Sequence, residues 1–309
     1  MRNHVPNMLL GSLCLALSAL AHAQIAVSPI NGTTVTKDTL AASLLGANSG
    51  ITITDVTYAG ANIATGEFSG GTNILGIASG IVLTSGSVNN VVGPNSSDGE
   101  TTDNGLPGDA QLTVLAGAPT EDASVLTITF VPTGTTLQFS YVFGSEEYPE
   151  FVDSEFNDVF ALFVNGTNRA IIPNTALPVA INNLNCGDEN GAGARPNCTL
   201  YVNNHFPGTI NTQLDGFTKV LTLTAPVNPG VPNTLKLAIA DTSDGILDSA
   251  VFIAGGSLTS CGGPSQPPCV TTPPVPGPAA SIPTLGEWSL LLLAMCAGLI
   301  GMNALRNRG

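Results

Sequence analysis

Basic residues are scarce in this sequence: 8 Lys and Arg stand against 22 Asp and Glu among 309 residues. Setting aside the two terminal segments described below leaves a body with a net charge near −16. Such a charge opposes contact with phosphate backbones and anionic lipids, so nucleic acid is not expected as a partner. The same charge favours solubility and attracts divalent cations.

Histidine and tryptophan are almost missing from the body. Only His205 lies between residues 24 and 281, and the single tryptophan, Trp288, lies outside it. A Ser–His–Asp arrangement needs a histidine, and the sequence also lacks G-x-S-x-G, a Walker-type phosphate loop and H-E-x-x-H. We therefore expect no catalytic residues and interpret His205 as an exposed loop residue. Paired carboxylates keep one alternative open, a secreted carbohydrate-active hydrolase.

Residues 1–23 have the pattern of a signal peptide. Arg2 precedes an apolar run from Met8 to Leu20, and Ala21-His22-Ala23 supplies small residues at positions −3 and −1. Cleavage is expected before Gln24, which would direct the body into the export pathway. An uncleaved membrane anchor is the alternative, although the apolar run is short for that role.

Residues 282–309 combine a short motif, an apolar span and a basic end. Ile282-Pro283-Thr284-Leu285 leads into Trp288, the span continues to Leu305, and Arg306 and Arg308 follow. The span is about long enough for one transmembrane helix, with the arginines on the cytoplasmic side. This order resembles the IPTL-CTERM sorting signals of Gram-negative bacteria. The resemblance implies cleavage by an exosortase-like transpeptidase, a transient inner-membrane intermediate and a final place at the cell surface or in the extracellular matrix. A plain single-pass anchor is the alternative.

Four cysteines remain in the body and its spacer. An even number in an oxidising compartment suggests disulfides, and proximity in sequence favours Cys186–Cys198 and Cys261–Cys269. Zinc is the alternative, but neither pair is C-x-x-C and only one histidine is nearby. Residues 259–281 are rich in Cys and Pro and indicate an extended spacer.

Short β-branched and aromatic runs, separated by Gly, Pro, Asn and Asp, fill the body. They predict an all-β fold, a jelly-roll-like β-sandwich, with one helix at Thr39–Leu45 and a long polar loop at residues 86–110. The expected strands are Gly50–Tyr58, Gly80–Thr84, Ser124–Val131, Leu137–Phe143, Val159–Val164, Val179–Ile181, Lys219–Thr224, Leu235–Ala240 and Ala250–Ala254.

A series of motifs runs in order along residues 24–258. The most specific are Ser145-Glu146-Glu147-Tyr148, Phe156-Asn157-Asp158 and Asp241 followed by Asp248-Ser249-Ala250-Val251-Phe252. With these motifs the body resembles the choice-of-anchor L domain. The resemblance implies an exported, β-rich surface domain, and it implies no enzymatic activity.

Two acidic segments precede expected strands. Glu146, Glu147, Asn157 and Asp158 lie in the first, and Asp241, Asp244 and Asp248 lie in the second. Like charges a few Å apart repel by about 1 kcal/mol in water and by several more when partly buried, so such a cluster needs a cation, raised pKa values or strong hydration. Our hypothesis is that these acids converge at one end of the sandwich and bind Ca²⁺, which prefers hard oxygen ligands. The alternative is a set of solvated acidic loops, and Glu150, Asp153 and Glu155 are expected to be solvated in either case.

The sequence thus predicts an exported surface or matrix module with a structural, adhesive or ligand-binding role. The expected partners are the exosortase-like transpeptidase and a surface or matrix ligand. The runner-up remains the hydrolase.

Overall fold

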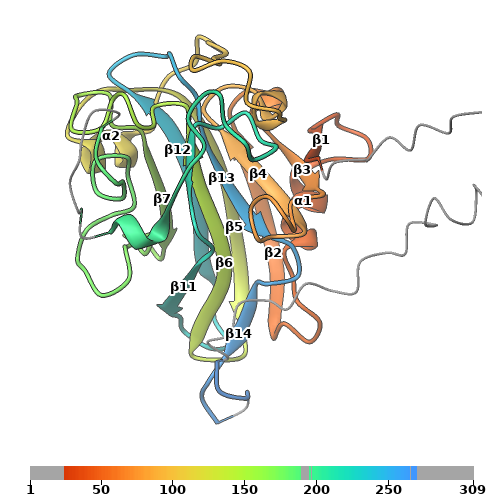
Figure 1. Ribbon diagram of the computed structural model, residues 1–309. Helices are drawn as coiled ribbons and strands as arrows, with labels where there is room; N and C mark the ends of the chain where they lie inside the picture. Colours follow the sequence, from red (N-terminus) through yellow and green to blue (C-terminus); the bar gives the residue numbers. More distant parts are fainter. Residues whose placement is uncertain (1–23, 189–194, 196, 265, 270–309) are drawn as a thin grey trace, which may run out of the picture. The chain divides into compact units, whose positions relative to one another are not determined.

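Two antiparallel sheets pack face to face in the computed structural model (Figure 1). The structure describes residues 24–188, 195, 197–264 and 266–269. The larger sheet has the order β1 (Ala26–Pro29), β3 (Thr65–Ser69), β4 (Ser79–Thr84), β13 (Ser249–Ala254), β6 (Thr136–Ser145), β10 (Gly216–Thr218), β9 (Tyr201–Asn203), and β11 (Leu221–Pro226) and β14 (Thr259–Cys261) also pair with β6. The smaller sheet has the order β2 (Ile51–Ala59), β5 (Thr120–Pro132), β12 (Asn233–Thr242), β7 (Val159–Val164), β8 (Thr167–Asn168). The all-β, jelly-roll-like sandwich expected from the sequence is confirmed.

The main core lies between the two sheets. Aromatic side chains meet across it. Phe160 of β7 stacks on Phe143 of β6 with ring centroids 5.1 Å apart. Tyr141 of β6 approaches the Phe160 ring edge-on, with centroids 5.5 Å apart. All three side chains are almost completely buried. Rings in such arrangements add to the stabilisation from burial of apolar surface.

The outer faces of the central strands are covered too. Helix α2 (Ala110–Ala116) places Leu112 in a cluster with Ala161 and Phe163 of β7 and with Ala238 of β12. This cover explains why β7 reads as a continuous apolar run, because a strand buried on both faces has no polar side. The 3-10 turn η2 (Val88–Val91) packs in the same way over the larger sheet, in a cluster with Val142 and Phe252.

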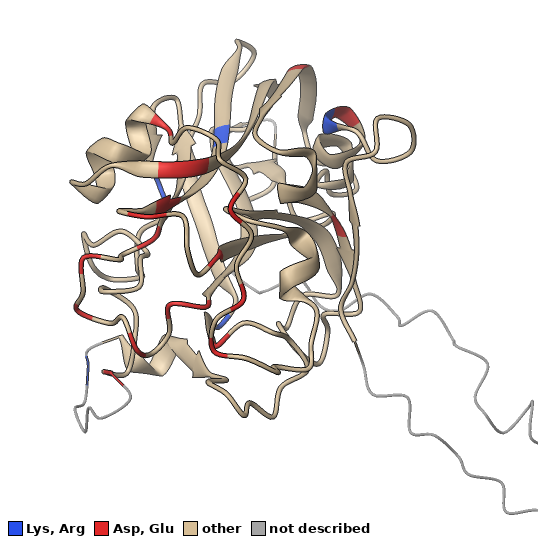
Figure 2. Cartoon of the chain, turned by 90° about the horizontal axis from the view of Figure 1, so that it is seen from above, with Lys and Arg blue, Asp and Glu red and all other residues tan. Residues whose placement is uncertain are grey.

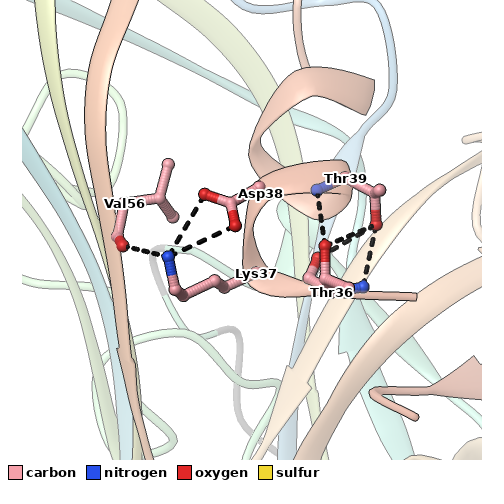
Figure 3. A network of polar contacts seen from close by, with 5 residues as sticks. All are labelled: Thr36, Lys37, Asp38, Thr39 and Val56. Carbon is pink, nitrogen blue, oxygen red and sulfur yellow. Dashed lines mark hydrogen bonds and ion pairs between the residues drawn. The ribbon is translucent and has the colours of Figure 1, made fainter. Parts of the chain in front are cut away.

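Helix α1 (Lys37–Ser43) begins with a reciprocal cap (Figure 3). The Thr36 hydroxyl accepts from the Thr39 N–H, and the Thr39 hydroxyl accepts from the Thr36 N–H. Lys37 Nζ donates to the Val56 carbonyl of β2 at 2.7 Å and pairs with Asp38. The sequence predicts this helix at Thr39–Leu45. The cap makes it begin two residues earlier, at Lys37.

One expected strand is wrong. Val179–Ile181 is buried but forms no strand: Ala180 makes an isolated bridge with Val159, the Val179 N–H donates to the Ala170 carbonyl at 2.9 Å, and the Ala180 carbonyl accepts turn bonds from Asn183 and Leu184. The segment is apolar because it packs on the core beneath a loop. The other expected runs coincide with or overlap strands.

The structure also contains elements that the sequence did not predict. Helix α2, the 3-10 turns η1 (Asn62–Ala64), η2 and η3 (Cys198–Leu200), and the short strands β1, β3, β8, β9, β10 and β14 were missed. Residues 86–110 include η2 and are therefore not one open loop.

Both expected disulfides are present. Cys186–Cys198 and Cys261–Cys269 join Cα atoms 4.5 and 5.0 Å apart. The expected signal peptide and the C-terminal sorting segment lie outside the described residues, and with the latter lie Ile282, Pro283, Thr284, Leu285, Trp288, Arg306 and Arg308. Within the described ranges, no helix has the length and apolar character of a membrane span.

Candidate functional site

One end of the sandwich gathers strand termini from both sheets. In the larger sheet β6 ends at Ser145 beside the start of β13 at Ser249, and in the smaller sheet β12 ends at Thr242 near the start of β7 at Val159. Figure 2, which views the molecule from above, shows acidic positions along several loops and few basic ones. We call this end of the sandwich, where β6 and β12 end and β7 and β13 begin, the acidic end.

Asp158, directly before β7, connects the two sheets at the acidic end. Its Oδ1 accepts from the Thr242 N–H at 2.9 Å, and its Oδ2 accepts from the Ser249 hydroxyl at 2.8 Å. Burial raises the pKa of Asp158 to about 7, although these two hydrogen bonds act in the opposite direction. The carboxylate is therefore anchored but costly to ionise.

Asp241, near the end of β12, is fully buried beside Asp158. Neither of its carboxylate oxygens has a partner in hydrogen-bond geometry, although the Ser85 hydroxyl is near. Burial, and then the negative charge of Asp158, raises the pKa of Asp241 well above its ordinary value. A buried carboxylate without donors is stable only if it is protonated or meets a cation.

Glu146 and Glu147 follow β6 and are also buried. Both oxygens of Glu146 and Oε2 of Glu147 lack a hydrogen-bond partner. Burial raises the pKa of each to about 10, reinforced by Asp215 at Glu146 and by Asp158 at Glu147. Polar groups of Glu100 and Gln213 near Glu146 offset only part of this increase.

Asp248 lies directly before β13, and both of its carboxylate oxygens accept hydrogen bonds from the protein. Oδ1 accepts from the Thr102 N–H at 3.1 Å and Oδ2 from Asn90 Nδ2 at 3.0 Å. Burial nevertheless raises the pKa of Asp248 to about 6. Its carboxylate occupies the space beside Gly86, where a Cβ would lie 1.8 Å from Oδ2.

The last two predicted residues lie at the margin. Asn157 Oδ1 accepts from the Asn182 N–H at 2.9 Å, and Asp244 is half-buried with Oδ1 accepting from the Ile246 N–H at 3.3 Å. The charge of Asp244 acts on Glu147, as that of Asp158 does. The two acidic segments of the sequence therefore meet in space.

Comparison with known families matches two parts of the chain. A family model, the choice-of-anchor L domain, matches residues 27–259. The chain belongs to the choice-of-anchor L domain family. Residues 280–307 match the IPTL-CTERM motif, which implies recognition by an exosortase-type sorting machinery. No curated protein and no solved structure matches the chain.

The acidic end of this choice-of-anchor L domain has little counter-charge. Across the described residues, lysine and arginine form ion pairs with Asp38, Asp153 and Asp109, and none pairs with Glu146 or Asp241. The negative charges at the acidic end thus raise one another's pKa values without a basic side chain to balance them.

Three residues of the choice-of-anchor L domain were not predicted as site residues. Glu150 and His205, expected in solvent, are half-buried with His205 Nδ1 2.9 Å from Glu150 Oε1, and Asp215 is fully buried. One signal was available for Asp215, because it stands directly before β10 just as Asp158 and Asp248 stand directly before β7 and β13. Nothing local in the sequence distinguished Glu150 or His205.

Proposed function

We propose that this exported choice-of-anchor L domain serves as a structural or adhesive module of the cell surface or extracellular matrix, with an acidic end that binds Ca²⁺. The family and the IPTL-CTERM motif make the chain an exported, surface-sorted β-sandwich protein. The role within that location, and the cation, are our inference.

One observation carries the cation proposal: five buried carboxylate oxygens of Glu146, Glu147 and Asp241 have no hydrogen-bond partner. An unpaired buried carboxylate costs several kcal/mol if it stays charged. Protonation removes that cost at acidic pH, but a divalent cation would remove it at neutral pH. A bound cation would also reverse the mutual repulsion of these groups.

Ca²⁺ suits this donor set better than other common ions. It takes six to eight oxygen ligands in flexible geometry and accepts backbone carbonyls and water along with carboxylates. Asp158, Asp241 and Glu147 would supply carboxylates from both sheets, and the charges of Asp248 and Asp244 act on this group as well. Binding would draw the three carboxylates together, because their ligand atoms do not all lie within 4.8 Å of one another. Mg²⁺, which demands a stricter octahedron and keeps its water, fits a buried mixed set less well.

The same burial argues against the hydrolase reading. Glycoside hydrolysis needs two carboxyl groups that face a substrate across an open site. Glu146, Glu147 and Asp241 are at most 2% exposed. Among the exposed large hydrophobic side chains of the described part, Phe206 is the one aromatic residue, so a sugar platform is not apparent there.

Thermal melting of the purified full-length chain tests the proposal. After a chelator has stripped the protein of metal and has been removed, added Ca²⁺ should raise the melting temperature by several degrees once its concentration is about 100 times the Kd. Asp241→Asn should abolish this response and raise the metal-free melting temperature at neutral pH, because it removes the cost of protonating a carboxyl group that is ionised in the unfolded chain. A generally damaged variant would instead lower the melting temperature in both conditions.

The matched control is Glu155→Gln, which neutralises an exposed carboxylate of the same segment. It should keep the full Ca²⁺ response. If millimolar Ca²⁺ leaves the wild-type melting temperature unchanged, the calcium proposal is wrong.

A further inference from the structure

A mixed cluster of one imidazole and two carboxylates lies next to the residues assigned to Ca²⁺, since the charge of Asp215 acts on Glu146 and that of Glu150 on Glu147, but it shares no residue with them. Glu150, His205 and Asp215 each offer one ligand atom, and these atoms all lie within 4.8 Å of one another. No other group of three such side chains in the described ranges is this compact. From this geometry we propose that Glu150, His205 and Asp215 bind a first-row transition-metal ion of the Zn²⁺ type.

Asp215 provides the first independent sign of a missing ligand. The residue is fully buried, and its Oδ1 accepts from Asn95 Nδ2 at 2.6 Å, while Oδ2 has no hydrogen-bond partner. The Asn95 bond fixes the direction of the carboxylate. The second oxygen is therefore held in place at the cluster, with no partner in hydrogen-bond geometry although the Phe206 N–H is near the carboxylate.

Tyr201 provides a second sign. Its hydroxyl is buried without a partner, and the charges of Asp215 and Glu150 both act on it. The hydroxyl would lie 2.5 Å from a Cβ at Gly216, so it is adjacent to the backbone that carries Asp215. Two unsatisfied polar groups at one cluster point to an absent polar partner.

The loop that carries His205 is rigidly built. The Asn204 side-chain amide donates to the carbonyls of Ile210, Thr212 and Leu214 at 3.3, 3.1 and 3.0 Å, and its Oδ1 accepts from the Ile210 N–H. Asn95 Nδ2 also donates to the Asn204 carbonyl at 2.8 Å. Ligands on either side of such a network need little reorganisation to bind an ion, and an ordered second shell supports metal affinity.

A simple ion pair between His205 and Glu150 explains less of the cluster. Their atoms are 2.9 Å apart, as an ion pair requires, but that pair provides no donor for Asp215 Oδ2. A metal ion would be shared by all three ligand atoms. Two ligands of one tetrahedral ion with bonds of about 2.0–2.2 Å would lie roughly 3.3–3.6 Å apart, so His205 and Glu150 would separate by about half an ångström on binding.

The donor set selects the metal. Ca²⁺ and Mg²⁺ prefer oxygen ligands alone, whereas imidazole suits Zn²⁺ and its first-row neighbours. Three protein ligands would leave one tetrahedral position for water. The Zn²⁺ site shares no residue with the proposed Ca²⁺ site, so either proposal can fail without the other.

Calorimetry and cobalt spectroscopy of the full-length chain, under non-reducing conditions, test the site. After chelator treatment, the wild type should bind one equivalent of Zn²⁺, and Co²⁺ should give the visible absorption of a tetrahedral complex. His205→Ala should weaken Zn²⁺ binding by about 100-fold or more and remove the cobalt band. Glu155→Gln should leave both signals unchanged.

Two further variants separate loss of ligand from loss of fold. Asp215→Asn keeps the shape and the Asn95 neighbour but should still lose the cobalt band. Asp241→Asn should lose the Ca²⁺ response and keep Zn²⁺ binding. Absence of Zn²⁺ binding by the wild type, or equal binding by folded His205→Ala, would overturn the proposal.

Discussion

Asp158 Oδ2 accepts a hydrogen bond of 2.8 Å from the hydroxyl of Ser249. Asp158 belongs to the start of β7 in the smaller sheet and Ser249 to the start of β13 in the larger sheet, so this bond joins the two layers at the acidic end. Ser249 Oγ also lies 2.9 Å from Ser145 Oγ at the end of β6. One short polar chain thus links three strand termini.

Ser249→Ala should destabilise the fold by about 1–3 kcal/mol, because Asp158 loses a buried donor. Thermal or chemical unfolding in a chelator would measure the loss. Ser79→Ala, at an exposed position of β4, is the matched control and should change stability by less than about 0.5 kcal/mol. Equal effects of the two substitutions would contradict the assigned role of the bond.

Metal-free protein should be more stable at pH 5 than at pH 8. Asp158 and Asp215 have pKa values of about 7 in the fold, against about 4 in an unfolded chain. Between these values the folded state keeps protons that the unfolded state has released, so stability decreases as pH rises. Glu146 and Glu147, with pKa values of about 10, extend the decrease to higher pH.

Melting curves in a chelator across this pH range would check the slope. Saturating Ca²⁺ should flatten it, because the cation binds the deprotonated carboxylates and stabilises the fold most at high pH. A metal-free melting temperature that rises from pH 5 to pH 8 would show that other groups dominate.

Gly86→Ala should disturb Asp248. The new Cβ would fall 1.8 Å from Asp248 Oδ2, so the carboxylate must leave its donors on Thr102 and Asn90. We expect a loss of about 1–3 kcal/mol, measured by unfolding, and a weaker Ca²⁺ response. Gly99→Ala, in the same segment with its nearest neighbours 3.9 Å away, should be tolerated.

Removal of the Cys186–Cys198 disulfide should lower stability without changing the fold. The bond closes a loop with a sequence separation of 12, for which chain entropy suggests roughly 3 kcal/mol. The Cys186→Ser, Cys198→Ser double variant, compared with the wild type in chemical unfolding, would measure it. Peptide mapping without reductant should recover Cys186 linked to Cys198 and Cys261 linked to Cys269.

The sorting proposal predicts a processed C-terminus. Mass spectrometry of protein from the cell surface or matrix should find the mature chain ending near Ile282–Leu285, with the segment from Trp288 to Arg308 removed. Pro283→Ala should retain that segment and hold the chain at the inner membrane. Full-length wild-type protein at its final location would favour the plain anchor instead.

The sequence was most informative where a strand is long and buried. Val159–Val164 was predicted with the observed limits because β7 is covered on both faces. Asp158 and Asp248 were predicted as candidate cation ligands because each directly precedes a buried strand. Strands of two to four residues, such as β8 and β10, are too short to show alternation. Helix α2 buries only Leu112, so it has almost no periodic signal.

The Glu150–His205–Asp215 cluster could not be derived in this way. Glu150 precedes both His205 and Asp215 by more than fifty residues, and the three meet because β10 pairs with the end of β6. Val179–Ile181 illustrates the reverse problem, since local composition records that a segment is buried but leaves open which neighbour supplies its hydrogen bonds. Long-range pairing decided both outcomes.

Strand β14 determines how the domain would carry a mechanical load. It pairs with residues 136–138 of β6, at the end of that strand remote from Ser145, and the chain then passes through the loop closed by Cys261–Cys269. The acidic end and the paired residues of β14 therefore lie at opposite ends of β6. Tension applied between these two ends of β6 would load its antiparallel hydrogen bonds in shear, so that several would have to break together. The Cys261–Cys269 disulfide would keep the residues between the two cysteines from extending.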